Sequence, residues 1–120
     1  MQELFNQIQK TKKENFFCIV EGKKDMQALR KIGFSIKNIF VLNNGKSLQE
    51  NIEKIINITK GRKVCILTDL DERGRKLYKA IARELSKQGI KLENGLRLQM
   101  IKENLSHLEG IPHFLKRRFL

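Results

Sequence analysis

The feature of this sequence that most constrains its fold is the regular alternation of short apolar runs with longer amphipathic segments. Apolar runs of strand length occupy residues 16–20, 39–42 and 64–67, and a stretch with helical periodicity follows each of them. Strands that alternate with helices form a parallel sheet covered on both faces and joined by right-handed crossovers. The sequence therefore predicts an α/β fold of the Rossmann-like kind.

Local signals add an N-terminal helix and one more strand, and they mark where one of the helices begins. Residues 1–14 have the spacing of a weak amphipathic helix, and Ser47 opens a capping box that begins another helix. The alternation of Leu96, Leu98 and Met100 predicts a half-exposed edge strand. We therefore expect a mostly parallel, four-stranded sheet flanked by helices.

Length and composition fit a single domain. The chain has 120 residues, 40% of them hydrophobic, which is enough for a buried core without disulfides. We expect one domain over residues 1–120, with a core at about 14–100, an N-terminal helix and a basic C-terminal extension. Cys18 and Cys65 lie inside apolar runs, so we expect two buried free thiols in neighbouring strands.

The net charge narrows the class of partner. The chain has 25 Lys and Arg residues against 13 Asp and Glu residues, a formal charge of +12 that is spread through both halves. A folded domain with this charge attracts polyanions, so we expect nucleic acid as the partner. The alternative is a general lysine-rich bias, as in thermophilic proteomes.

The sequence shows no sign of membrane insertion or export. No apolar stretch approaches the roughly 20 residues of a membrane span. The N-terminal segment also lacks the apolar core of a secretion signal. We therefore expect a cytoplasmic protein without a membrane partner.

Three acidic residues follow predicted strands. Glu21 ends the first apolar run, and Asp69 and Asp71 follow the third. The carboxyl ends of parallel strands meet at one edge of a sheet, where such folds bind ligands, so we expect these acids to converge. Close carboxylates repel one another unless a cation lies between them, and Mg²⁺ prefers oxygen ligands. Two aspartates so spaced are also common as a helix cap or a solvated loop.

This arrangement resembles the Toprim family in the runs IVEGKKDMQALRKIG and CILTDLDERGRKL. Glu21 matches the glutamate that ends the first strand of that family, and Asp69, Asp71 and Gly74 match its DxDxxG motif. The resemblance covers roughly residues 14–100. It is strongest to small stand-alone archaeal Toprim proteins, which are related to the 5S ribosomal RNA maturase and to the Toprim domains of primases and topoisomerases.

The resemblance implies Mg²⁺-dependent phosphoryl transfer on RNA or DNA, with Mn²⁺ as the alternative ion. Glu21 would act as general acid or base, or as a metal ligand, and Asp69 and Asp71 would bind the ion. A nuclease-like enzyme is one interpretation, and a non-catalytic nucleic-acid-binding module that works with a partner protein is the alternative. A haloacid-dehalogenase-like phosphatase also uses two such aspartates, but Arg73 stands where that family requires Thr or Val.

Basic residues around the acids are the candidate phosphate contacts. Together with the motif glycine, they are Lys23, Lys24, Lys46, Arg73, Gly74, Arg75 and Lys76. Type IA topoisomerases carry an acid where this chain has Arg75, so a third carboxylate is missing at that point. His107 and His113 are isolated in the sequence, and we expect neither to bind metal. We expect Tyr78 to be a packing residue.

Overall fold

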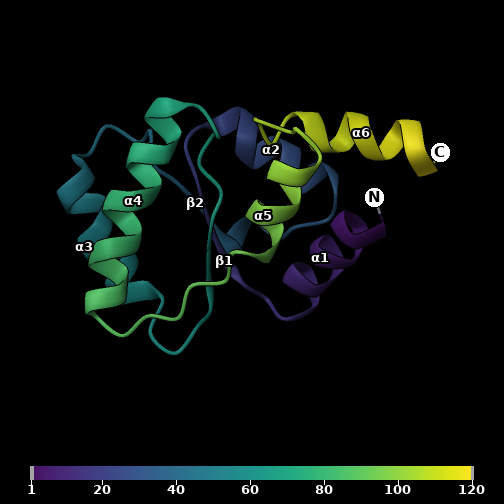
Figure 1. Ribbon diagram of the computed structural model, residues 1–120. Coiled ribbons are helices and arrows are strands. Elements are labelled where there is room, and N and C mark those ends of the chain that lie inside the picture. Colours follow the sequence, from purple (N-terminus) through teal and green to yellow (C-terminus); the bar gives the residue numbers. More distant parts are fainter. Residues whose placement is uncertain (1, 120) are drawn as a thin grey trace.

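The computed structural model describes residues 2–119 and has three parallel strands between two layers of helices (Figure 1). The strands are β1 (Phe17–Val20), β2 (Ile39–Val41) and β3 (Val64–Ile66). They form one sheet in the order β2-β1-β3, with β1 in the middle. The predicted α/β class is confirmed.

Helices connect and cover the strands. They are α1 (Gln2–Lys13), α2 (Lys23–Lys31), α3 (Leu48–Ile58), α4 (Glu72–Lys87), α5 (Gly95–Lys102) and α6 (Gly110–Phe119), with a short 3-10 turn, η1 (Ile36–Asn38). The predicted capping box is confirmed: Ser47 Oγ accepts from the Glu50 amide, and Glu50 Oε1 accepts from the Ser47 amide. Pairing both end groups in this way fixes where α3 begins.

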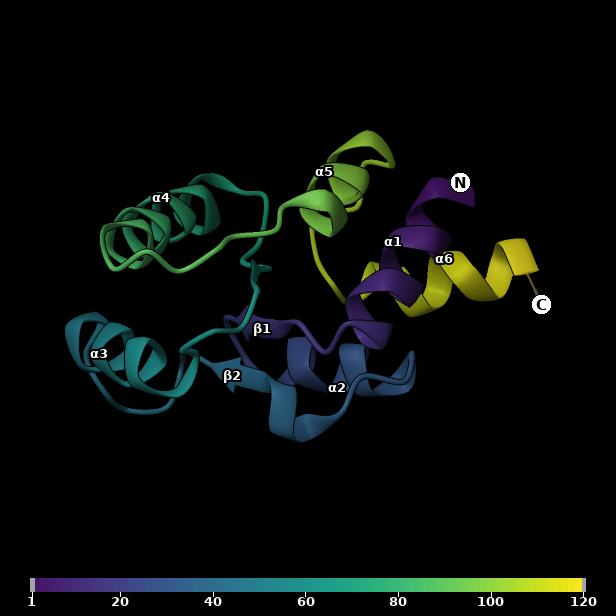
Figure 2. The same ribbon diagram turned by 90° about the horizontal axis from the view of Figure 1, so that it is seen from below.

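The sheet divides the core into two layers, because successive residues of a strand face opposite sides. Cys18 and Val20 of β1 pack with α1, α2, α5 and α6. Phe17 and Ile19 pack with α3 and α4. Figure 2 shows these two groups of helices on opposite sides of the strands. Cys18 lies beside Cys65 of β3, and both are buried free thiols, as predicted.

The order of the strands creates a switch point between β1 and β3. The chain leaves β1 through α2 to reach β2 on one side, and then returns through α3 to place β3 on the other side. Helices that leave two adjacent strands in opposite directions open a crevice beyond the carboxyl ends of those strands. Residues that follow β1 and β3 are therefore the residues that a ligand would meet.

The prediction of a fourth strand is wrong: the sheet has three strands. Beside β3 there is an isolated bridge between Val64 and Leu92, and the segment with alternating apolar residues forms α5 instead. Leu96 and Met100 are four positions apart and both face the core, whereas Leu98 is 54% exposed. In a helix, residues four positions apart lie on the same face, so both Leu96 and Met100 can be buried. This segment is also rich in residues without a β-branch, which favour helices.

Candidate functional site

Glu21 is buried at the end of β1 and contacts the loop that follows β3. Its side chain is 8% exposed, and Oε2 accepts a hydrogen bond from the backbone N–H of Asp69 at 2.6 Å. The structure therefore brings the glutamate carboxyl to the aspartate loop across the switch point. The expected approach of these two segments follows from the parallel pairing of β1 with β3.

Asp69 is held by three segments that are far apart in the sequence. Its N–H bonds to Glu21 of β1, and its backbone carbonyl accepts from Nη2 of Arg97 of α5 at 3.4 Å. Its side-chain Oδ1 lies 3.1 Å from Nδ1 of His107, in the turn between α5 and α6. The position of this aspartate is therefore set by tertiary contacts and not by the local loop alone.

Asp71 serves as the N-cap of α4. Its Oδ1 accepts from the Gly74 N–H at 2.7 Å, which satisfies one of the free amides at the helix start. Gly74 itself is buried, and a Cβ at this position would overlap the backbone carbonyl of Asp69. Thr68 Oγ1 donates to the Gly74 carbonyl at 2.7 Å and closes the loop from the other side. The motif glycine is needed here because the two backbones approach so closely.

Arg97 supports the loop from below. Arg97 is 6% exposed, and its Nη1 donates to the carbonyls of Thr68 at 2.6 Å and Ile66 at 3.3 Å. The guanidinium also lies 4.5 Å from the centre of the Tyr78 ring, whose hydroxyl donates to Asn94 Oδ1. Tyr78 is thus a packing residue, as predicted. Burial lowers the pKa of Arg97, and the nearby acids Glu21 and Asp69 oppose that shift.

Burial and neighbouring negative charge disfavour the ionised forms of two acids at this edge, Glu21 and Asp25. The pKa of Glu21 is raised chiefly by burial, and the charges of Asp69 and Asp71 raise it further, against the bond from the Asp69 amide and the attraction of Arg73. Asp25 in the first turn of α2 accepts from the Gly22 N–H at 3.0 Å, yet burial and the charge of Asp69 raise its pKa too. A cation at this edge would relieve the repulsion.

The donor set fits a hard divalent cation. Within residues 2–119, no three His, Cys, Asp or Glu side chains lie in an arrangement that holds an ion by themselves. Mg²⁺ is commonly bound by one or two carboxylates, with water and substrate phosphate as the remaining ligands. Glu21, Asp69 and Asp71 supply carboxylate oxygens, and the acid repulsion described above is the feature that a bound cation would remove.

Three of the predicted phosphate contacts lie at the start of α4. Arg73 and Lys76 line an open groove together with Asp71 and Leu48, between the first turns of α3 and α4. Lys76 also forms an exposed ion pair with Glu72 at 3.4 Å. Arg75 instead turns back, and its Nη1 donates to the Leu70 carbonyl at 2.6 Å, so it braces the loop.

The other predicted contacts lie on neighbouring loops. Lys23 and Lys24 are exposed in the first turn of α2, directly after Glu21. Lys46 is exposed in the loop before α3, where its N–H donates to Asn44 Oδ1. These lysines border the carboxyl edge without a direct contact to the acids.

Two residues at this site were missed by the sequence analysis. Arg97 stands among apolar residues in α5, and a lone arginine in such a stretch is a usable sign of a buried cation. His107 gave no such sign, because its contact with Asp69 joins residues that are far apart in the sequence. The burial of both Leu108 and Ile111 after His107 explains why this turn is held against the site.

A three-stranded parallel domain with carboxylates at its switch point has the arrangement of a Toprim-type domain. The family model described as Toprim-like matches residues 18–103, and the chain belongs to that family. Membership indicates a metal-dependent role related to nucleic acids. No helix among the described residues is both long and apolar enough to cross a membrane.

Its relatives include small archaeal UPF0292 proteins. The chain is 28% identical over 103 residues to one from Methanocaldococcus jannaschii, covering 83% of this chain and 78% of the relative. It is 35% identical over 107 residues to one from Methanosarcina barkeri, covering 86% and 72%. A solved structure of a protein from Aquifex aeolicus superposes with a TM-score of 0.72 at 32% identity, covering 92% of this chain and 96% of that one.

Proposed function

We propose that this protein is an Mg²⁺-dependent, nuclease-like phosphoryl-transfer enzyme that acts on RNA or DNA. The observation that carries the proposal is the contact between Glu21 and Asp69: a buried carboxyl is held against the DxDxxG loop, although burial and the charges of Asp69 and Asp71 raise the pKa of Glu21. A buried carboxylate near other acids lowers the stability of the fold unless a bound cation neutralises the charge.

In this proposal each acid has a separate role, which follows from its position. Asp69 and Asp71 would hold the divalent ion, and Mn²⁺ would replace Mg²⁺ because both accept oxygen ligands. The ion would neutralise charge on the phosphate and orient it. Glu21 holds or moves the proton of the attacking or leaving oxygen, because its raised pKa brings it closer to neutral pH, where proton transfer is most effective.

The groove beside Asp71 supports a polyanionic substrate. Arg73 and Lys76 line it beside the acids Asp71 and Glu72, and the first residue of α3, Leu48, and the first turn of α4 both border it. Lys23, Lys24 and Lys46 extend the positive charge along the edge. The backbone of a nucleic acid, with one phosphate per nucleotide, suits a row of such contacts.

The test is divalent-ion-dependent cleavage. End-labelled structured RNA and supercoiled plasmid DNA are incubated with the protein in Mg²⁺, Mn²⁺ or EDTA, next to Glu21→Gln and Asp71→Asn variants. We expect cleavage by the wild type with either metal, none in EDTA, and large losses in both variants. If no substrate is cleaved under any metal condition, the proposal of catalysis fails.

The second candidate is a non-catalytic nucleic-acid-binding module that works with a partner protein. It is favoured by the observation that no three metal-ligating side chains are already gathered in the described chain. Binding without turnover, weakening steeply with salt as phosphate contacts require, would support this candidate over the enzyme.

A further inference from the structure

The turn that follows α5 places a histidine on the acid edge. His107 Nδ1 lies 3.1 Å from Asp69 Oδ1, and the Leu70 N–H donates to the neighbouring Ser106 carbonyl at 2.9 Å. Leu108 on the other side is 1% exposed and belongs to the core. The residues on both sides of His107 are therefore held in place, and they keep the imidazole next to Asp69.

This contact completes the restraint of Asp69. Its N–H is bound by Glu21 and its carbonyl by Arg97, which fixes the backbone on which the side chain stands. The contact between Oδ1 and His107 then fixes how the carboxylate is rotated. Hydrogen bonds to a carboxylate from outside a metal site are known to orient it and to set its affinity for the ion.

We propose that His107 is a positioning residue for Asp69: its Nδ1–H donates to Oδ1 and leaves Oδ2 for a divalent cation. The inference rests on the proposed function, because it takes Asp69 to be a metal ligand. The contact uses one carboxylate oxygen of Asp69 and one nitrogen of the imidazole. Through Nδ1–H the imidazole is a hydrogen-bond donor to that oxygen, so it orients the carboxylate and leaves the second oxygen for the ion.

The test compares metal affinity in four proteins by titration calorimetry with Mg²⁺ and with Mn²⁺. They are the wild type, His107→Leu, His107→Asn and His113→Leu. We expect His107→Leu to weaken binding of both ions about tenfold. His107→Asn retains most of the affinity, because the asparagine Nδ2 occupies the place of the imidazole Nδ1. His113→Leu is the matched control on α6 and leaves the affinity unchanged.

Several results would overturn this role. Unchanged or tighter binding by His107→Leu would show that the imidazole does not orient the ligand, while the proposed function would stand. Loss of Mn²⁺ affinity alone, without rescue by asparagine, would make the imidazole a direct ligand, since nitrogen donors favour Mn²⁺ over Mg²⁺. Failure of the wild type to bind either ion would overturn the proposed function and this inference with it.

A stability control separates positioning from folding. All four proteins are melted in EDTA, where no cation is bound. We expect the Tm of His107→Leu to stay close to that of the wild type, because the contact is partly exposed to water, with 53% of the His107 side chain accessible. A loss of metal affinity that only follows an equal loss of folded protein would assign the contact to the fold and overturn the proposal.

Discussion

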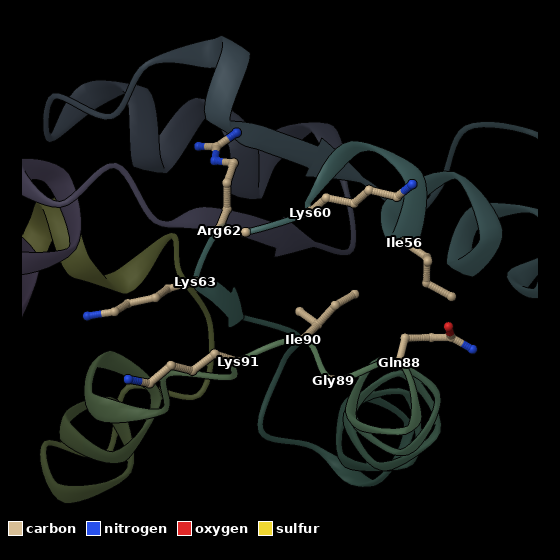
Figure 3. A pocket seen from close by; sticks show the side chains of 9 residues that line it. Ile56, Lys60, Arg62, Lys63, Gln88, Gly89, Ile90 and Lys91 are labelled. Carbon is tan, nitrogen blue, oxygen red and sulfur yellow. The ribbon is translucent and has the colours of Figure 1, made fainter.

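The two ends of the same three strands each carry charged side chains, and they differ in what those side chains contact. At the amino end, the segments before β3 and after α4 form a basic groove over an apolar floor (Figure 3). Its lining includes Ile56, Lys60, Arg62, Lys63, Ile90 and Lys91. At the carboxyl end lie Glu21, Asp69 and Asp71.

The charges of the basic groove are explained by the fold. Arg62 donates to Asn15 O at 2.8 Å and Asn38 Oδ1 at 2.7 Å, and Lys63 pairs with Glu14 at 3.0 Å. The helices α3 and α4 end at this groove, and cations stabilise the negative ends of helices. In Figure 3, Lys63 and Lys91 point the same way, whereas Arg62 and Lys60 each point in another direction, so the four cationic side chains do not converge on one point.

The acids of the carboxyl end are explained by the fold only in part. Asp71 caps α4 and Asp25 accepts from the Gly22 N–H, so both satisfy helix starts. Glu21 and Asp69 do not cap a helix, and burial together with acid repulsion raises the pKa of Glu21. The comparison teaches that charge in excess of what the fold requires marks a functional site better than charge alone.

The largest expected effect is a difference in nucleic-acid cleavage between variants at the two ends of the strands. Asp69→Asn should reduce Mg²⁺-dependent cleavage at least about 100-fold, because a transition-state charge loses its counter-ion. The double variant Lys60→Gln/Lys91→Gln, in the basic groove, should cleave at nearly the wild-type rate. Initial rates at saturating substrate measure both. Equal losses at the two ends would show that the comparison does not predict function.

The next effect concerns a glycine at each end. Gly74→Ala should lower the free energy of unfolding by about 3 kcal/mol, because its Cβ overlaps the Asp69 backbone, which cannot move away without breaking the loop. Gly61→Ala, in the basic groove, should cost about 1 kcal/mol, since its φ of +75° is unfavourable for alanine although the space around it is open. Urea unfolding followed by circular dichroism measures both. Similar costs would contradict the close approach seen at Gly74.

Two arginines, one at each end of the strands, make similar contacts and can be compared directly. Arg97 and Arg62 both donate to backbone carbonyls and both lie over an aromatic ring, at 4.5 and 5.2 Å. Arg97→Met should lower the unfolding free energy by about 2–3 kcal/mol, because buried carbonyls lose their donor, and Arg62→Met by about 1 kcal/mol, because water can replace it. Chemical unfolding in EDTA measures the difference. A larger loss at Arg62 would reverse the assignment of the two roles.

The smallest effect is a pH dependence of opposite sign at the two ends. The native state binds the Glu21 proton more tightly than the unfolded chain does, so stability falls as pH rises from the ordinary glutamate value of 4.5 through the raised pKa. Glu21→Gln keeps an acceptor for the Asp69 N–H and should remove that fall. Metal-free Tm measured against pH tests this.

Glu14 at the amino end should behave in the opposite way. A hydrogen bond from Lys63 lowers its pKa, so its small contribution to stability is present above pH 4.5 and disappears as pH falls through the lowered pKa. Glu14→Gln should therefore lose stability near neutral pH and none in acid. An exposed pair gives a weak effect, and a Glu14 variant with a larger change than Glu21→Gln would contradict the contrast.

Much of the fold could be predicted from the sequence, because the strands are buried on both faces and read as continuous apolar runs. Residues 16–20 and 64–67 have this property, and Ser47 marks a helix start through local chemistry. The segment from Gly95 to Lys102 could not be predicted, since its apolar spacing fits a strand as well as a helix. Packing of Leu96 and Met100 against the core decided between them.

The site was predictable to the extent that topology dictates it. Residues that follow two paired parallel strands must lie near one another, which is why Glu21 and Asp69 could be placed together. The contacts of Arg97 and His107 could not be placed, because they depend on how α5 and the turn after it pack. No local pattern records a contact between residues so far apart in the chain.

The restraint of Asp69 by distant residues has a consequence for biosynthesis. A chain emerging from the ribosome exposes its amino-terminal portion first. The DxDxxG loop leaves the exit tunnel before Arg97 and His107, so a nascent polypeptide carries the acids well before it carries the groups that arrange them. The arrangement of Asp69 described above is therefore completed only when translation has delivered the residues of α5 and of the turn after it.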